Sequence, residues 1–431
     1  MTTTQNALTL TREKESVSWE YYSWIVISLC ALFLFYKYVL QVSPSVMTKD
    51  LMAEFHIHGA ALGNLAATYF YAYLVTQLFV GPLLDRFSPR YLTTFAILVC
   101  ATGALLFSNT HSLIVAQLAR ALMGAGTAFA TVSYMKMSAI WFRPNQVAFV
   151  DGLLATAAMT GALCGQVPLT ILVTHAGWRD SLLYCGLFGV VFAVFFLLLA
   201  RDKNPLIQPL KTESAGIQFK DVVALLKDKK NWLLTFYSGL AFTPIAVLGG
   251  LWGNPFFEVA HHLTSTEAAL YTSCIFLGLA LGGPLFGFIA GKTGNSLQVM
   301  IAGTWVGLIS LLFAIYVVEL PLWLFGFFLF TFGLGTGVFM LSFPFGKSLN
   351  SIHLAATVVA LINTGDALFG SFTEPLIGKI LDMLWDGKVL NQIHVFSLQH
   401  YHIALSLLPI YLFFALVCLY LMRRQKKDLT L

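Results

Sequence analysis

The sequence predicts an all-α membrane protein whose 12 transmembrane helices form two similar six-helix bundles. First, 58% of its 431 residues are hydrophobic and only 10% are charged, whereas soluble domains carry about 25% charged residues. Second, apolar runs long enough to cross a bilayer recur along the whole chain. Third, features of the first half return in the second half.

The same composition argues against several other classes of protein. The formal net charge is only +5 and the basic residues are dispersed, so no nucleic-acid-binding face is expected. All six cysteines lie in apolar runs without a CxxC pair, which gives no indication of a metal site or cofactor. The sequence contains no HExxH, GxSxG or Walker motif, so we expect no enzymatic activity.

The first bundle is predicted over residues 21–200, after a polar tail at 1–20. Each of its spans is an apolar run of about 20 residues or more, the length that a bilayer requires. The six spans are 21–46, 59–84, 91–109, 112–140, 149–173 and 181–200.

A polar, lysine-rich segment at 201–231 separates this bundle from a second one at 232–422, and a basic tail follows at 423–431. The second bundle has the same pattern of apolar runs. Its six spans are 232–257, 266–290, 297–318, 322–346, 352–382 and 399–422.

Lys and Arg placement predicts the orientation. With the N-terminus inside, most of the 25 Lys and Arg residues fall in inner loops and tails, whereas the outer loops hold Lys49, Arg179 and Lys388. Basic loops stay in the cytoplasm, so both termini are predicted to be cytoplasmic. Short loops and the lack of Asn-x-Ser/Thr sites fit a bacterial inner membrane. We expect a monomer in the lipid bilayer.

The loop after the second span reads Gly81-x3-Asp85-Arg86-x-Ser88-Pro89-Arg90, and the loop after the eighth reads Gly287-x3-Gly291-Lys292-x-Gly294. The first loop resembles the Gly-x3-Asp-Arg-x-Gly-Arg-Arg motif of the major facilitator superfamily, with Ser88 replacing a glycine and Pro89 a basic residue. The second is a weaker copy in which Gly291 replaces the acid. Internal repeats of this kind are typical of secondary transporters.

Further motifs extend this resemblance over nearly the whole chain. Arg120-x3-Gly124-Ala125-Gly126 in the fourth span is similar to another motif of the superfamily. The antiporter signature of the fifth span is matched only in part, which argues against drug/proton antiport. Some sequence features resemble the organic-anion symporters and a branch that includes lysosomal dipeptide transporters: Trp141-Phe142, Gly177-Trp178-Arg179 and Trp252-Gly253.

The resemblance implies that the charged loop after the second span is a cytoplasmic gate. In the superfamily its acid contacts the N-terminal end of the eleventh span and a nearby basic residue, and this contact closes the inner side. An acid is stabilised at that positive helix end. The gating residues predicted in this way are Gly81, Asp85, Arg86, Arg90 and Lys292.

Two basic residues within spans are candidates for substrate binding, because ionisable groups inside a membrane usually face a polar path. Lys37 lies deep in the first span, and Gln41 shares its helical face; Lys37 would bind a carboxylate, or else extend to the outer interface. Arg120 could hold a carboxylate with two hydrogen bonds, or instead bond to helix ends within its own half.

Two acids in the eleventh span are candidates for proton coupling. Asn363, Asp366 and Glu374 fall on one stripe at helical spacing, and we expect Asn363 to contact substrate. A carboxylate away from water resists ionisation, so Asp366 could take up and release a proton. The alternative is a fixed ion pair between Asp366 and Lys37. Glu374, beside Pro375, could instead serve as a gate or polar cap.

Four aromatic residues complete the candidate site, with core packing as the alternative for each. Tyr hydroxyls at mid-membrane can bond a polar solute, and Tyr69 and Tyr73 are one turn apart in the second span. Tyr237 and Trp252 lie in the seventh span.

These residues lead to one functional hypothesis with two alternatives. A secondary active transporter would move an organic anion, amino acid or short peptide by alternating access, coupled to protons in symport. A facilitative uniporter of dipeptides or amino acids is one alternative. A membrane sensor or scaffold that uses the same fold without transport is the other.

Overall fold

The computed structural model describes residues 2–205, 223, 225–351, 354–390 and 393–427, and most of the predicted central segment at 201–231 lies outside these residues. The first half is helical throughout. It comprises α1 (Thr2–Val42), η1 (Ser43–Val46), α2 (Thr48–Phe55), α3 (Gly59–Arg86), α4 (Pro89–Asn109), α5 (Leu113–Trp141), α6 (Pro144–Cys164), α7 (Val167–Ala176) and α8 (Trp178–Leu199).

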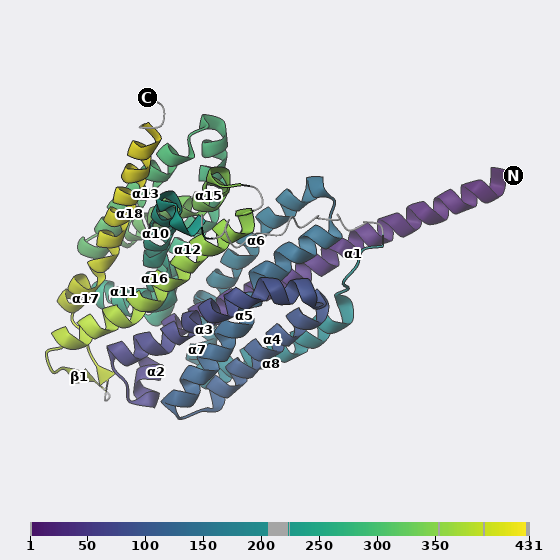
Figure 1. Ribbon diagram of the computed structural model, residues 1–431. Helices are drawn as coiled ribbons and strands as arrows, with labels where there is room; N and C mark the ends of the chain where they lie inside the picture. Colours follow the sequence, from purple (N-terminus) through teal and green to yellow (C-terminus); the bar gives the residue numbers. More distant parts are fainter. Residues whose placement is uncertain (1, 206–222, 224, 352–353, 391–392, 428–431) are drawn as a thin grey trace.

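The second half repeats this order of long helices (Figure 1). Its elements are α10 (Lys229–Val247), η2 (Leu248–Trp252), α11 (Gly253–His261), α12 (Ser265–Thr293), α13 (Ser296–Tyr316), α14 (Leu322–Thr336), η3 (Gly337–Leu341), α15 (Ser342–Leu349), α16 (Ala355–Leu384), β1 (Val389–Leu390), β2 (Ile393–His394), α17 (Leu398–Leu405) and α18 (Leu407–Lys427). The two short strands form an antiparallel hairpin.

Within the described residues, 11 helical segments are long and apolar enough to cross a membrane. The one remaining predicted span, the eleventh at 352–382, corresponds to α16, a helix of 30 residues packed along α3 and α10. Its length is sufficient for a span, but Asp366, Glu374, Lys379 and Asp382 make it the most polar of the twelve. The membrane fold is therefore as predicted, and the predicted span with most charges is the one at the junction between the halves.

The first charged loop has Ser88 where the second has Gly294, and the backbone conformation at each position explains this difference. Ser88 is the N-cap of α4, where its hydroxyl accepts from the Tyr91 N–H, and Pro89 occupies the first helical turn. Both residues suit a helix start, and φ at Ser88 is −57°, so glycine is not required there. Gly294, in contrast, ends α12 with φ of +65°, a left-handed conformation that favours glycine.

We call the side of the bundle where α3 ends and α18 ends the terminal side; α2, the hairpin and α17 lie on the opposite side (Figure 1). The halves approach most closely on the opposite side. A Cβ added at Gly59 or Gly63 of α3 would lie 2.6 Å and 2.4 Å from the backbone oxygens of Gly378 and Glu374 in α16. At the terminal end of α3, a Cβ at Gly81 would meet no atom within 4 Å.

Candidate substrate and gating sites

Lys37 is a buried cation in α1. Its side chain is 5% exposed, and its ammonium nitrogen lies 4.8 Å from the ring centre of Tyr73 in α3 and 5.1 Å from that of Tyr38. These aromatic faces attract the charge. No carboxylate lies within ion-pair distance of Lys37 among the described residues. The fixed pair with Asp366, considered as an alternative above, is therefore not formed in this structure.

Asp366 is its counterpart in the other half. The residue is 5% exposed on α16, and its Oδ1 has no hydrogen-bond partner among the described residues. The side chain that faces it is Ser238 of α10, whose fully buried hydroxyl interacts with the Asp366 carboxylate but makes no hydrogen bond of regular geometry among the described residues. Buried polar atoms are nearly always hydrogen-bonded, so these two groups have bonding capacity that a solute, water or proton could use.

Glu374 lies two helical turns beyond Asp366, at the point where the halves touch. It is 1% exposed, and its Oε2 has no partner among the described residues. Its backbone oxygen accepts a hydrogen bond from the Trp252 indole at 3.1 Å. Trp252, also buried, therefore fixes the α16 backbone at this level, and its nitrogen is engaged within the second half.

Arg120 makes the backbone contacts that were the alternative to substrate binding. The guanidinium donates to the Leu40 carbonyl of α1 at 2.8 Å and to the Ala66 carbonyl of α3 at 3.4 Å, above the Tyr69 ring. The Leu40 carbonyl is available because the residue four positions on is Pro44, which has no N–H. Arg120 thus connects α1, α3 and α5, although its Nε has no hydrogen-bond partner in the part of the chain that the structure describes.

The remaining predicted binding residues divide into two groups. Tyr69 and Tyr237 are fully buried and bond within their own halves, to Thr127 at 2.7 Å and to Thr304 at 3.3 Å. Gln41 and Asn363 are half-buried on α1 and α16. The structure therefore brings Tyr73 to Lys37, whereas the hydroxyls of Tyr69 and Tyr237 already have partners.

The charged loop is held within the first half. Lys136 of α5 donates to Asp85 Oδ1 at 2.7 Å and to the Leu84 carbonyl at 2.6 Å. The Asp85 side chain is 79% exposed, and its carboxylate pairs with Lys136. Among the described residues it makes no hydrogen bond or ion pair with the eleventh span, so the expected contact is not seen in this part of the chain.

The other predicted gating residues have different surroundings. Arg90 donates through its side chain to the Leu197 carbonyl in the last turn of α8, and its backbone N–H bonds Asp202 at 2.8 Å. Because the last carbonyls of a helix lack intrahelical donors, Arg90 caps α8. Arg86 and Lys292 are exposed on the terminal side.

A buried polar network, which we call the opposite-side network, joins the halves far from that loop. Gln166 donates to the Gly249 carbonyl at 2.8 Å and to the Ser45 hydroxyl at 3.1 Å. Asn254 donates to the Ser45 carbonyl at 3.2 Å and to Gln166 Oε1 at 3.1 Å, and accepts from Thr272. All four side chains are at most 3% exposed.

A second connection, the Asp382 clasp, lies at the start of α3. The Asp382 carboxylate of α16 accepts from the backbone N–H groups of Gly59 at 2.8 Å and Ala60 at 2.7 Å. These are among the first N–H groups of a helix, which have no intrahelical acceptor and carry partial positive charge. Beside it, the His58 and His394 rings stack 3.5 Å apart across the halves.

Sequence reasoning missed the opposite-side network and the clasp, although one signal was present. The two halves carry matching proline motifs, Val42-Ser43-Pro44 and Gly253-Asn254-Pro255. In the structure these equivalent segments meet, since Asn254 bonds the backbone just after Pro44. Matching motifs at the ends of equivalent spans could therefore have indicated a contact across the pseudo-twofold axis.

The amino-acid sequence is similar to those of several transporters. The chain is 26% identical over 289 residues to an uncharacterized transporter, YybO, of Bacillus subtilis, covering 62% of this chain and 66% of that protein. It is 21% identical to a probable sulfoacetate transporter of Cupriavidus necator (66% and 69% covered). It is 23% identical to a probable L-galactonate transporter of Escherichia coli (59% and 58% covered). The chain thus spans about two thirds or less of the length of these relatives.

The fold is shared with solved transporters. A bacterial homologue of the human lysosomal transporter Spinster, in an inward-facing and unoccupied conformation, superposes with a TM-score of 0.76 at 14% identity, covering 94% of this chain and 97% of that one. The model of the Major Facilitator Superfamily matches residues 24–374. The helical architecture, the repeat and the family match agree, and this multi-pass membrane protein belongs to the Major Facilitator Superfamily.

Proposed function

We propose that this chain is a secondary transporter that moves a small organic anion together with a proton by alternating access. The observation that carries the proposal is Lys37, a buried cation between two tyrosine rings with no carboxylate beside it in the described chain. An unpaired charge inside a membrane protein is costly. A bound anion would supply the missing negative charge.

The relatives support an anionic solute. Two of them are named as probable transporters of sulfoacetate and of L-galactonate, and both compounds carry an acidic group. The Tyr73 ring beside Lys37 limits the direct approach to its ammonium from that face. The anionic group would therefore bind on the remaining side of Lys37, with Gln41 one turn away on α1 as a further donor.

The two acids of α16 supply the proton sites in this proposal. Asp366 and Glu374 are at most 5% exposed, and each has one carboxylate oxygen without a hydrogen-bond partner among the described residues. A buried ionised carboxylate without a matching cation costs several kcal/mol, whereas a protonated one does not. Binding and release of a proton at these acids would therefore follow their exposure to either side of the membrane.

The contacts between the halves support an inward-facing state. The opposite-side network, the Asp382 clasp and the Lys49–Glu258 ion pair at 2.5 Å all join the halves on the opposite side. We assign that side to the outside, because most basic loop residues lie on the terminal side. The terminal side then faces the cytoplasm, in a bacterial inner membrane. Asp85 would close it after exchanging Lys136 for the start of α16.

The proposal is tested by uptake into proteoliposomes with an imposed proton gradient. Wild-type protein should accumulate one or more of a panel of sulfonates, sugar acids and other carboxylates. The initial uptake rate of Lys37→Met should be at least tenfold lower than that of wild type. Lys37→Arg, which keeps the positive charge, should retain part of the uptake. Lys229→Met, which removes an exposed lysine at the start of α10 outside the proposed binding and gating sites, is the matched control for loss of a charge. Equal uptake by wild type and Lys37→Met would refute the anion site.

The coupling is tested separately on the same vesicles. Asp366→Asn and Glu374→Gln should uncouple accumulation from the proton gradient while leaving counterflow of the anion measurable. Accumulation unchanged in both variants would favour uniport. Uptake of amino acids or dipeptides in preference to anions would favour the zwitterionic class. Transport of no member of the panel by wild type would favour a sensor or scaffold.

A further inference from the structure

A groove on α18, unrelated to the transport site, has the features of a lipid site. It has a volume of about 390 Å³ and is lined by Val417, Tyr420, Leu421, Arg423 and Arg424. Tyr420 lies seven residues before the end of α18 at Lys427, which is about 10 Å along the helix. The groove is therefore close to the terminal membrane surface, at the depth of the lipid headgroups.

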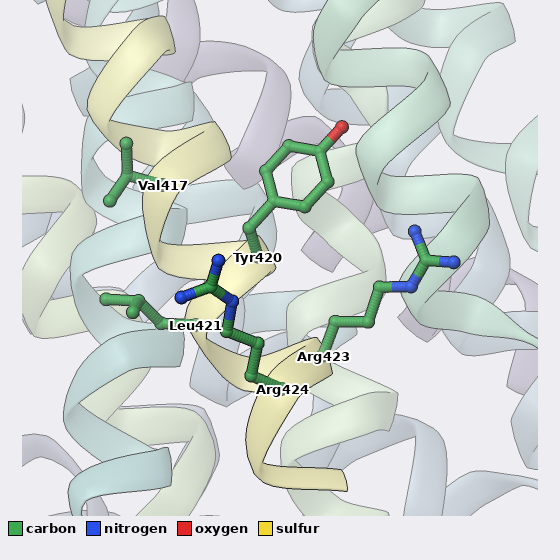
Figure 2. A pocket seen from close by; sticks show the side chains of 5 residues that line it. All are labelled: Val417, Tyr420, Leu421, Arg423 and Arg424. Carbon is green, nitrogen blue, oxygen red and sulfur yellow. The ribbon is translucent and has the colours of Figure 1, made fainter. Parts of the chain in front are cut away.

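The two arginines line this groove, with the Arg424 guanidinium beside Leu421 and that of Arg423 on the other side of Tyr420 (Figure 2). Side chains on a helix point toward its N-terminus, and Figure 2 shows both guanidinium groups turned back along α18 toward the level of Tyr420 and Leu421. Neither arginine forms an ion pair with a carboxylate within the described residues. Two positive charges thus lie beside apolar side chains, and no acid of the described residues pairs with either of them.

Tyr420 adds an oriented hydroxyl. The indole N–H of Trp305 in α13 donates to the Tyr420 oxygen at 3.3 Å. Because that oxygen already accepts a hydrogen bond, the phenolic O–H remains to donate to a ligand. Leu421 is 43% exposed and lies one turn from Val417, so this face offers an apolar strip to an acyl chain directly above the charged end.

We propose that this groove binds the headgroup and upper acyl chain of an anionic phospholipid. Guanidinium groups match phosphate oxygens in geometry and charge. A zwitterionic phosphatidylethanolamine would bring an ammonium group against two arginines, whereas phosphatidylglycerol brings only the negative phosphate. The site is therefore selective for the anionic lipid of the leaflet on the terminal side.

Native mass spectrometry of the detergent-solubilised full chain, titrated with phosphatidylglycerol or phosphatidylethanolamine, measures this directly. Wild-type protein should hold one phosphatidylglycerol more tightly than any phosphatidylethanolamine. The double variant R423Q/R424Q should bind it about 30-fold more weakly, which is about 2 kcal/mol at 1.4 kcal/mol per tenfold. Its melting temperature without lipid should equal that of wild type, because both side chains are exposed.

The matched control is R143Q/K203Q, which removes two exposed charges from the same side outside the groove. It should change the affinity less than threefold. Equal weakening in the two double variants would overturn the site, since the effect would then be one of general charge. Stabilisation of lipid-free protein by inorganic phosphate to the same extent as by phosphatidylglycerol would also overturn it in favour of a free-anion site.

Discussion

Replacement of Asp382 by alanine should open the opposite side. In the closed state the carboxylate accepts two hydrogen bonds, from Gly59 and Ala60, at the positive end of α3. Hydrogen bonds to charged groups contribute about 1.5–3 kcal/mol each, and the side chain is half-buried. We therefore take the lower value for both bonds, about 3 kcal/mol in total.

A loss of this size changes the ratio of closed to open molecules by about 140-fold, at 1.4 kcal/mol per tenfold. Conformational states of one protein differ by only a few kcal/mol, so the variant should populate the open state substantially. The remaining inter-half contacts, including the opposite-side network, set how much of the closed state persists.

The change is measured by electron–electron distance spectroscopy with spin labels at Ile114 and Met383. These residues are 77% and 76% exposed and lie at the opposite-side ends of α5 and α16, in a background without the six native cysteines. Asp386→Ala is the control, because that carboxylate bonds only Lys388 in its own loop. The reasoning is refuted if Asp382→Ala gives the same distance distribution as Asp386→Ala.

Three further outcomes follow from the geometry. Asp85→Asn should reduce transport severalfold at unchanged expression, because it weakens the proposed inner closure; normal initial uptake rates would contradict this. Arg120→Lys should lower the free energy of unfolding by about 2–4 kcal/mol, since a lysine cannot reach two helix carbonyls in the same fork; an unchanged melting temperature would argue against the structural role. The pKa of Glu54 is lowered overall. Burial raises this pKa, but the hydrogen bonds from His111 and Arg179 lower it by more. The stabilisation from these bonds should be fully present above the ordinary pKa of 4.5 and lost as the pH falls through the lowered pKa of Glu54, so wild type but not Glu54→Gln should show this loss in melting curves.

The fold could be predicted because the membrane imposes it. A bilayer requires runs of about 20 apolar residues, and this requirement predicts the order of the spans, 11 of which meet it in length and hydropathy within the described residues. The interruptions were not predictable in the same way. The seventh span changes to a π-helical turn at Leu248–Trp252, and the fifth is divided between α6 and α7 at Gly165 and Gln166. Both breaks are local and leave the mean hydropathy of the span unchanged.

The candidate site was predictable only for groups whose burial is itself unusual. Lys37, Asp366 and Glu374 stood out because ionisable residues are rare in spans, and all three are buried in the structure. Which partners they have depends on neighbours distant in sequence. Arg120 could not be assigned to Leu40 from the sequence, because the Leu40 carbonyl lacks a backbone donor on account of Pro44 in η1, whereas Arg120 lies in α5.

A proline in α16 has an analogous effect between the halves. Pro375 lacks the N–H that would bond the Ser371 carbonyl, and the Tyr71 hydroxyl of α3 donates to that carbonyl instead, at 3.3 Å. When the halves separate, water can replace Tyr71 without any change in helical structure, and such an exchange is nearly neutral in free energy. This connection is therefore a reversible one: it orients α3 on α16 during closure but adds little to the barrier for reopening, as repeated turnover requires.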